Sequence, residues 1–64
     1  MRINRIKLRI AMIEKDIGRN ELAKLTGIST TTISNVANGK SCSNNTACAI
    51  AKALGIDLEE ILER

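Results

Sequence analysis

The sequence predicts an all-α fold of five short helices in one domain, residues 1–64. Hydrophobic residues make up 44% of the chain, and most of them are Ile, Leu and Ala, whereas aromatic residues and proline are absent. Apolar residues recur at helical spacing, and glycines rather than long linkers separate the runs. So short a chain buries only about 60% of the surface that its unfolded form exposes, so we expect a small, compact core with little room for an active-site cavity.

Glycines bound the first two predicted helices. The first covers about residues 4–15 and stops near Gly18. The second covers residues 19–26, and Glu21 lies in its first turn, where a negative charge is favourable at the amino-terminal end of the helix dipole. Gly27 ends the second helix, because glycine adopts the left-handed conformation without a steric cost.

The third predicted helix runs from Ser29, whose hydroxyl can cap the N–H of Thr31 or Thr32, to Asn38 before Gly39. Its β-branched threonines give it a poor helix propensity, so packing must support it. Three apolar side chains fall on one side of the helical wheel: Ile33, Val36 and Ala37. Polar side chains fall on the other side: Thr30, Thr31, Ser34, Asn35 and Asn38.

Two further helices are predicted after the loop at residues 40–43. The fourth covers about residues 44–54 and ends at Gly55, and a fifth short helix over residues 58–63 is capped by Asp57. The core positions of the fourth helix are Ala47, Ile50, Ala51 and Leu54. Those of the fifth are Leu58, Ile61 and Leu62.

Two adjoining stretches carry a recognisable pattern, ELAKLTGIS at residues 21–29 and TTTISNVANGK at residues 30–40, and IAKALGI follows at residues 50–56. Together they resemble the DNA-binding core and fourth helix of the Cro/C1 repressor family, also called the XRE family. The resemblance covers nearly the whole chain. It implies a lambda-repressor-like fold with a helix-turn-helix at helices two and three, whose second helix enters the major groove of DNA.

The chain departs from the family pattern at three places. Arg19 follows Gly18 where relatives often have Gln after a small capping residue, and Asn44 stands where the family commonly has proline. Late in helix one the family often has an arginine that pairs with a glutamate in helix three, and the matching residues here are Met12 and Ala37. We expect an apolar contact in place of that ion pair, which need not lower stability.

The exposed face of helix three and the residues around it are the predicted DNA contacts. The candidates for reading bases are Thr30, Thr31, Ser34, Asn35 and Arg19. The candidates for binding phosphates are Arg19, Asn38, Lys40, Ser43 and Asn45. Asn35 has a second interpretation, as a polar residue that only solvates an exposed helix face.

Charge is distributed unevenly along the chain. Residues 1–40 carry eight Lys and Arg against three Asp and Glu, a net of +5, whereas residues 41–64 carry two against four, a net of −2. One end can therefore face a polyanion, although an ordinary solvated surface also explains these charges. Because modules for RNA and single strands stack bases on aromatic side chains, the absence of such side chains favours duplex DNA.

Other chemistries have weak support. The Gly-Lys-Ser at residues 39–41 looks like the end of a P-loop, but Ser34 stands where that pattern requires glycine. Cys42 and Cys48 could form a metal pair or a redox switch, but without histidine they cannot complete a structural zinc site, and we interpret them as a loop cysteine and a half-buried helix cysteine. We expect no enzyme activity, catalytic residue, metal or cofactor. With no signal peptide and no apolar run that spans a bilayer, we expect a cytoplasmic protein.

Helix one has two apolar sides. Its isoleucines cluster on one side, whereas Leu8, Ala11 and Met12 lie nearly opposite. The clustered residues are Ile3, Ile6, Ile10, Ile13 and Ile17. Either the fifth helix covers this side, or it is a protein-binding surface used for dimerisation or for another partner.

These expectations combine into a bacterial or phage transcriptional regulator, interpreted as a repressor, that binds double-stranded DNA as a homodimer. Two other classes stay open. The chain can be an antitoxin that binds a toxin and regulates its own synthesis. It can also be a protein-interaction domain on the same scaffold, because a fold does not determine a function.

Overall fold

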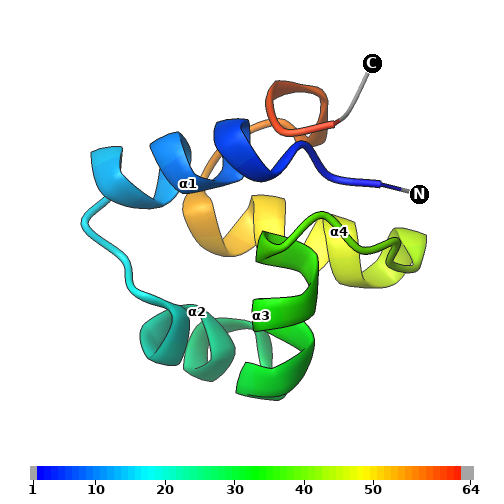
Figure 1. The fold of residues 1–64 in the computed structure, drawn as a ribbon. Coiled ribbons are helices and arrows are strands. Elements are labelled where there is room, and N and C mark those ends of the chain that lie inside the picture. The colour runs from blue at the N-terminus through cyan, green and yellow to red at the C-terminus, as the bar shows by residue number, and fades with distance from the viewer. Residues whose placement is uncertain (1, 63–64) are drawn as a thin grey trace.

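Four α-helices and one turn of 3-10 helix form the described part of the chain, residues 2–62 of a computed structural model (Figure 1). They are α1 (Arg5–Glu14), α2 (Arg19–Thr26), α3 (Thr30–Ala37), α4 (Asn44–Leu54) and η1 (Leu58–Glu60). In Figure 1, α4 crosses the middle of the molecule, with α1 on one side and α2 and α3 on the other. The predicted all-α class is confirmed, since these residues form only isolated bridges between Arg2 and Ser41 and between Ile3 and Leu62.

The core consists of aliphatic side chains from every helix. Among the described residues, no polar or charged side chain is buried with them. The buried residues are Ile3, Leu8, Ala11, Leu22, Ile33, Val36, Ala37, Ala47, Ile50, Ala51, Leu54 and Ile61. All the core positions predicted for helices three and four are among them, so the helical wheel identified the inward faces correctly.

Side-chain caps set the starts of three helices. Asn4 Oδ1 accepts hydrogen bonds from the backbone N–H groups of Ile6 and Lys7, both at 3.0 Å. Ser29 Oγ accepts from the N–H of Thr32 at 3.2 Å, which confirms the predicted cap of α3. Ser43 caps α4 in the same way, through Thr46 at 3.2 Å. These bonds satisfy N–H groups that have no partner within the helix.

The predicted bounds of the second and fourth helices are confirmed, and both helices end at glycines in the left-handed region, Gly27 (φ 74°) and Gly55 (φ 70°). The end of α1 differs from the prediction. Asp16 adopts a left-handed φ of 55°, so the helix stops at Glu14 and the chain turns before Gly18. Aspartate is one of the few residues other than glycine that tolerate this conformation.

The predicted fifth helix is wrong as an α-helix, because η1 is a single 3-10 turn of three residues. Its end at residue 63 lies outside the described residues. Ile61 has φ −119°, well outside the α-helical value, so the helical backbone does not continue through it. At this point the chain meets the amino-terminal segment: Asn4 N–H donates to the carbonyl of Ile61 at 2.7 Å, and Ile3 pairs with Leu62 in an isolated bridge.

The short η1 leaves much of helix one uncovered. Ile3 is buried and Ile17 packs partly against the core, but Ile6, Ile10 and Ile13 are 61%, 53% and 72% exposed. We call these three residues the α1 isoleucine stripe. The prediction that the fifth helix covers this side is therefore wrong for the stripe and holds only near Ile3.

Leu22→Ala tests the packing of α2. Leu22 is fully buried, so its truncation should lower the free energy of unfolding by about 2–5 kcal/mol, through lost burial and a residual cavity. Leu25→Ala is the matched control on the same helix, because Leu25 is 56% exposed and its loss should cost under about 0.5 kcal/mol. Urea denaturation followed by circular dichroism measures both, and equal losses would contradict the assignment of the core.

Candidate nucleic-acid interface

A three-residue turn sets α2 against α3. Gly27 has φ 74°, and its N–H donates to the carbonyl of Ala23 at 2.8 Å. The next N–H, that of Ile28, donates to Thr26 Oγ1 at 3.2 Å, and Ser29 then caps α3. Each residue of the turn thus has a defined backbone conformation or hydrogen bond, so α3 starts at a defined angle to α2.

The two faces of α3 differ as its sequence predicts. Ile33, Val36 and Ala37 are buried against the core. On the other face Thr30, Thr31 and Asn38 are exposed, whereas Ser34 and Asn35 are half-buried. Every side chain on that face is short, so the backbone of α3 can approach another surface closely.

Arg19 lies beside the middle of α3 although it belongs to the first turn of α2. Its Nη1 is 3.5 Å from Ser34 Oγ, at the long limit for a hydrogen bond. Arg19 is exposed, and this contact places its guanidinium group beside the polar face of α3. The structure therefore brings Arg19 together with the α3 face, as the sequence suggested.

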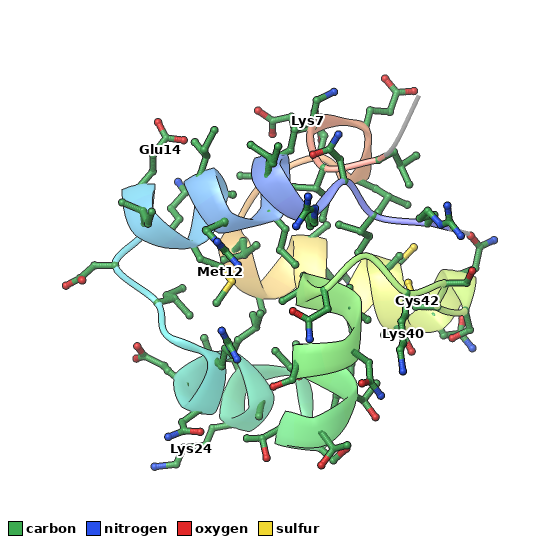
Figure 2. All side chains as sticks on the ribbon, viewed as in Figure 1. Lys7, Met12, Glu14, Lys24, Lys40 and Cys42 are labelled. Atoms are coloured by element: carbon green, nitrogen blue, oxygen red, sulfur yellow. The ribbon has the colours of Figure 1, made fainter. Side chains whose placement is uncertain are left out.

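Lys40 is held next to the carboxyl end of α3. Its N–H donates to the carbonyl of Asn35 at 3.1 Å after a tight turn in which Gly39 has φ 93°. The side chain is exposed, and Figure 2 shows it extending from the loop between α3 and α4 on the side away from α1. A flexible ammonium group at this place extends the polar surface of α3 by one positive charge.

The remaining phosphate candidates have other surroundings. Ser43 already caps α4, and its Oγ is 3.0 Å from Thr46 Oγ1. Asn45 is exposed, but it lines a shallow hollow together with Lys52 and Asp57, on the side of α4 that faces η1. Asn45 therefore borders the hollow between α4 and η1.

Two arginines near the amino terminus also lie beside the polar surface of α3 and Lys40, and they were not among the contacts predicted from the sequence. Arg2 bridges to Ser41, and the side chain of Arg5 passes so close to Gly39 that a Cβ there would lie 3.8 Å from Arg5 Cδ. Both therefore lie beside the loop that carries Lys40. The excess of basic residues in the first 40 positions was the available signal, but it did not show which of them meet.

A cleft of about 390 Å³ separates α1 from the start of α2 and the end of α3. Met12 and Ala37, the residues at which an apolar contact was predicted, both line it. Arg9 and Arg19 line the same cleft.

The two cysteines are placed the opposite way to the prediction. Cys42, in the loop, is half-buried and packs against the core, whereas Cys48, in α4, is exposed. Burial raises the pKa of the Cys42 thiol. Within residues 2–62, no three His, Cys, Asp or Glu side chains are grouped so that they can hold a metal ion.

Residues 7–64 match the Cro/C1-type HTH DNA-binding domain, so the chain belongs to this family and the resemblance inferred from its sequence is confirmed. No curated protein sequence matches the chain. None of the described helices is both long enough and apolar enough to cross a membrane.

Solved structures of two kinds have a similar fold. The transcriptional regulator VanUg is 27% identical with a TM-score of 0.81, over 97% of this chain and 83% of that one. A dioxygenase from Streptomyces albus, solved with 2-hydroxyethylphosphonate and Fe(II), is 25% identical with a TM-score of 0.83, over 91% of this chain and 13% of its own length. A mutant hydroxyethylphosphonate dioxygenase, 22% identical with a TM-score of 0.88, is similar in fold alone, and this chain spans only 14% of it.

Alkylation rates should distinguish the two thiols. At neutral pH the exposed Cys48 should react faster with iodoacetamide than Cys42, because Cys42 is less accessible and its raised pKa leaves less of the reactive thiolate. The difference between the two alkylation rates should narrow as pH rises through the pKa of Cys42. Peptide mass spectrometry over time measures both rates, and faster labelling of Cys42 would be inconsistent with the structure.

Proposed function

We propose that this chain is a sequence-specific, double-stranded DNA-binding transcriptional regulator that reads the major groove with α3. One observation carries the proposal: α3 buries its apolar face and exposes a row of short polar side chains, in a chain of a DNA-binding family. A helix of these dimensions fits the major groove of B-DNA. The likeness to a transcriptional regulator over nearly the whole chain supports the same function.

Base reading is assigned to the outer face of α3 and to Arg19. The Asn35 amide can pair with the N6 and N7 edge of adenine, and the methyl groups of Thr30 and Thr31 can contact a thymine methyl. Ser34 can bond to either kind of base. Residues 30–38 contain no Lys or Arg, so Arg19 is the guanine reader of this surface. The preferred half-site is therefore rich in A·T pairs, with at most one guanine.

Phosphate binding is assigned to the polar residues around α3. The proposed contacts are Arg19, Asn38, Lys40, Ser43 and Asn45, together with the N–H groups that begin α2 and α4. Arg2 and Arg5 add two cations next to Lys40. Asn45 has the weakest structural support of the proposed contacts, because it lines the hollow between α4 and η1.

The working unit on DNA is a homodimer, because one eight-residue helix contacts too few base pairs to be selective in a genome. Its half-sites should lie about 34 Å apart on one face of the duplex. Repression by occlusion of a promoter in the cytoplasm of a bacterium is the simplest mechanism, and we propose no catalytic role for these residues. Selection of bound sequences from a random duplex pool tests the proposal: no enrichment, or sites without two-fold symmetry, would contradict it.

The second candidate is a protein-binding role, as in an antitoxin, and the exposed α1 isoleucine stripe favours it. In that case purification from the native host would yield a stoichiometric partner. Failure to bind any duplex at low salt would favour a role in protein interaction alone.

Lys40→Ala should weaken binding to all duplexes and reduce the steepness of its salt dependence. Each neutralised phosphate contributes about 0.9 to the slope of log K against log salt, so the slope should fall by about one unit. Lys52→Ala is the matched control, because Lys52 lies in the last turn of α4 and, of the proposed contacts, only Asn45 lines the same hollow. Fluorescence anisotropy over a salt series measures both, and an unchanged slope for Lys40→Ala would remove Lys40 from the phosphate contacts.

Asn35→Ala should cost about 1–3 kcal/mol on the selected site and much less on random duplex, because it removes base reading and leaves the phosphate contacts intact. Asn35 is half-buried and lies outside the apolar core, so truncation should spare the fold. The affinities of the Asn35→Ala variant for the selected site and for random duplex, measured beside those of the wild type, test this prediction. An equal loss on the two would show that Asn35 does not read bases.

A further inference from the structure

The α1 isoleucine stripe is the largest group of exposed apolar side chains on one described helix. Ile6, Ile10 and Ile13 are each more than half exposed, and the other large exposed hydrophobic residue, Leu25, lies on α2. The inner side of α1 is already occupied, because Leu8 and Ala11 are buried in the core. The stripe is therefore a second apolar side of α1, separate from the side that packs into the core.

Two opposite charges lie along one flank of the stripe. Lys7 and Glu14 are exposed and two helical turns apart, about 10.5 Å along α1. Both line a shallow hollow beside Ile10, and Figure 2 shows both side chains on the side of α1 that points away from α2 and α3. They are too far apart along the helix to pair with each other, because helix neighbours are three or four residues apart.

We propose that the α1 isoleucine stripe binds the same stripe of a second copy of this chain, with the two α1 helices antiparallel across a two-fold axis at Ile10. The axis places Ile10 against its own symmetry mate, and it places Ile6 of each copy near Ile13 of the other. The same rotation brings Lys7 of each copy next to Glu14 of the other, so two ion pairs form. This self-complementarity is what an isologous interface requires.

The charges select a second copy over other occupants. A chance apolar patch carries no charge order, whereas here a positive and a negative group lie on opposite sides of Ile10 along the helix, three and four residues from it, on the same flank. Glu60 lines the same hollow, and its Oε2 accepts a hydrogen bond from Asp57 N–H at 2.9 Å, but among the described residues no ion pair joins its carboxylate to Lys7. Lys7 is therefore available to the second copy.

The contact should be weak. The helix has ten residues and is about 15 Å long, so the buried area falls below the roughly 1,200 Å² at which stable interfaces begin. On the other flank, Arg9 lies near its own symmetry mate, and this repulsion lowers the affinity further. Self-association should thus depend strongly on concentration.

This contact is distinct from the side-by-side arrangement that two adjacent half-sites need. The stripe is exposed, and only Ile13 also borders the cleft toward α2 and α3, whereas those two helices lie on the core side of α1 (Figure 1). A pair formed through α1 therefore holds its two α3 helices on outer surfaces. The inference goes beyond DNA binding, and it can fail or hold independently of the proposed function.

Charge reversal in trans is the decisive experiment. Lys7→Glu and Glu14→Lys alone each replace two attractions with two repulsions, so each should weaken self-association about tenfold at low salt. An equimolar mixture of the two variants should recover the wild-type affinity, because only the mixed pair has Glu opposite Lys at both positions. Sedimentation equilibrium of the full chain measures all three samples, and recovery in the mixture requires a second, antiparallel copy.

Matched variants test the apolar part. Ile10→Asp should abolish self-association, whereas Leu25→Asp, at a residue of similar exposure outside the stripe, should leave it unchanged. Thermal melting and binding to a single selected half-site confirm that the variants fold. Three results would each overturn the proposal. They are a wild-type chain that stays monomeric, an Ile10→Asp chain that still associates, and a mixture of the two charge variants that associates no more tightly than either variant alone. The first of these results would leave a different protein as the occupant of the stripe.

Discussion

The burial of Ile33 and Val36 stabilises α3 in a helical form that its own residues disfavour. The helix has eight residues and begins with three threonines, and helices of this length are marginal in water. Packing against the core supplies the missing stability, and the Ser29 cap secures the first turn. The surrounding polar groups are then positioned relative to α3, Arg19 through Ser34 and Lys40 through the carbonyl of Asn35. The proposed reading surface is therefore the outer side of a packing interaction.

Local signals made much of this fold predictable. Glycines with positive φ and capping serines act within a few residues, so the bounds of α2 and α4 could be read from the sequence. The errors come from interactions over longer distances. The fifth helix stops after one turn, where Ile61 leaves the helical conformation and its carbonyl accepts from Asn4, near the other end of the chain, and no local pattern indicates that contact.

The candidate site likewise has features that local patterns predict and features that depend on contacts between distant residues. The helical wheel separated the two faces of α3, because periodicity determines which residues share a side. It also detected two apolar sides on helix one, but it could not show which of them is covered, because that depends on the length of η1. Likewise, the proximity of Arg2 and Arg5 to the loop at Lys40 follows from the path of the amino-terminal segment, which only the fold reveals.

The fold by itself does not determine the function, since a transcriptional regulator and much longer dioxygenases both contain it. The surface residues must carry the distinction. Here the reading face of α3 has no cation of its own, while Arg5 and Lys40 lie beside its carboxyl end and Arg19 contacts its middle. In the proposed function, phosphate contacts attract any duplex and the neutral groups of α3 discriminate bases, and Arg19 alone is assigned to both tasks. If α3 reads only the few bases that an eight-residue helix can reach, selectivity requires a second copy, and so the surfaces that join copies matter as much as α3.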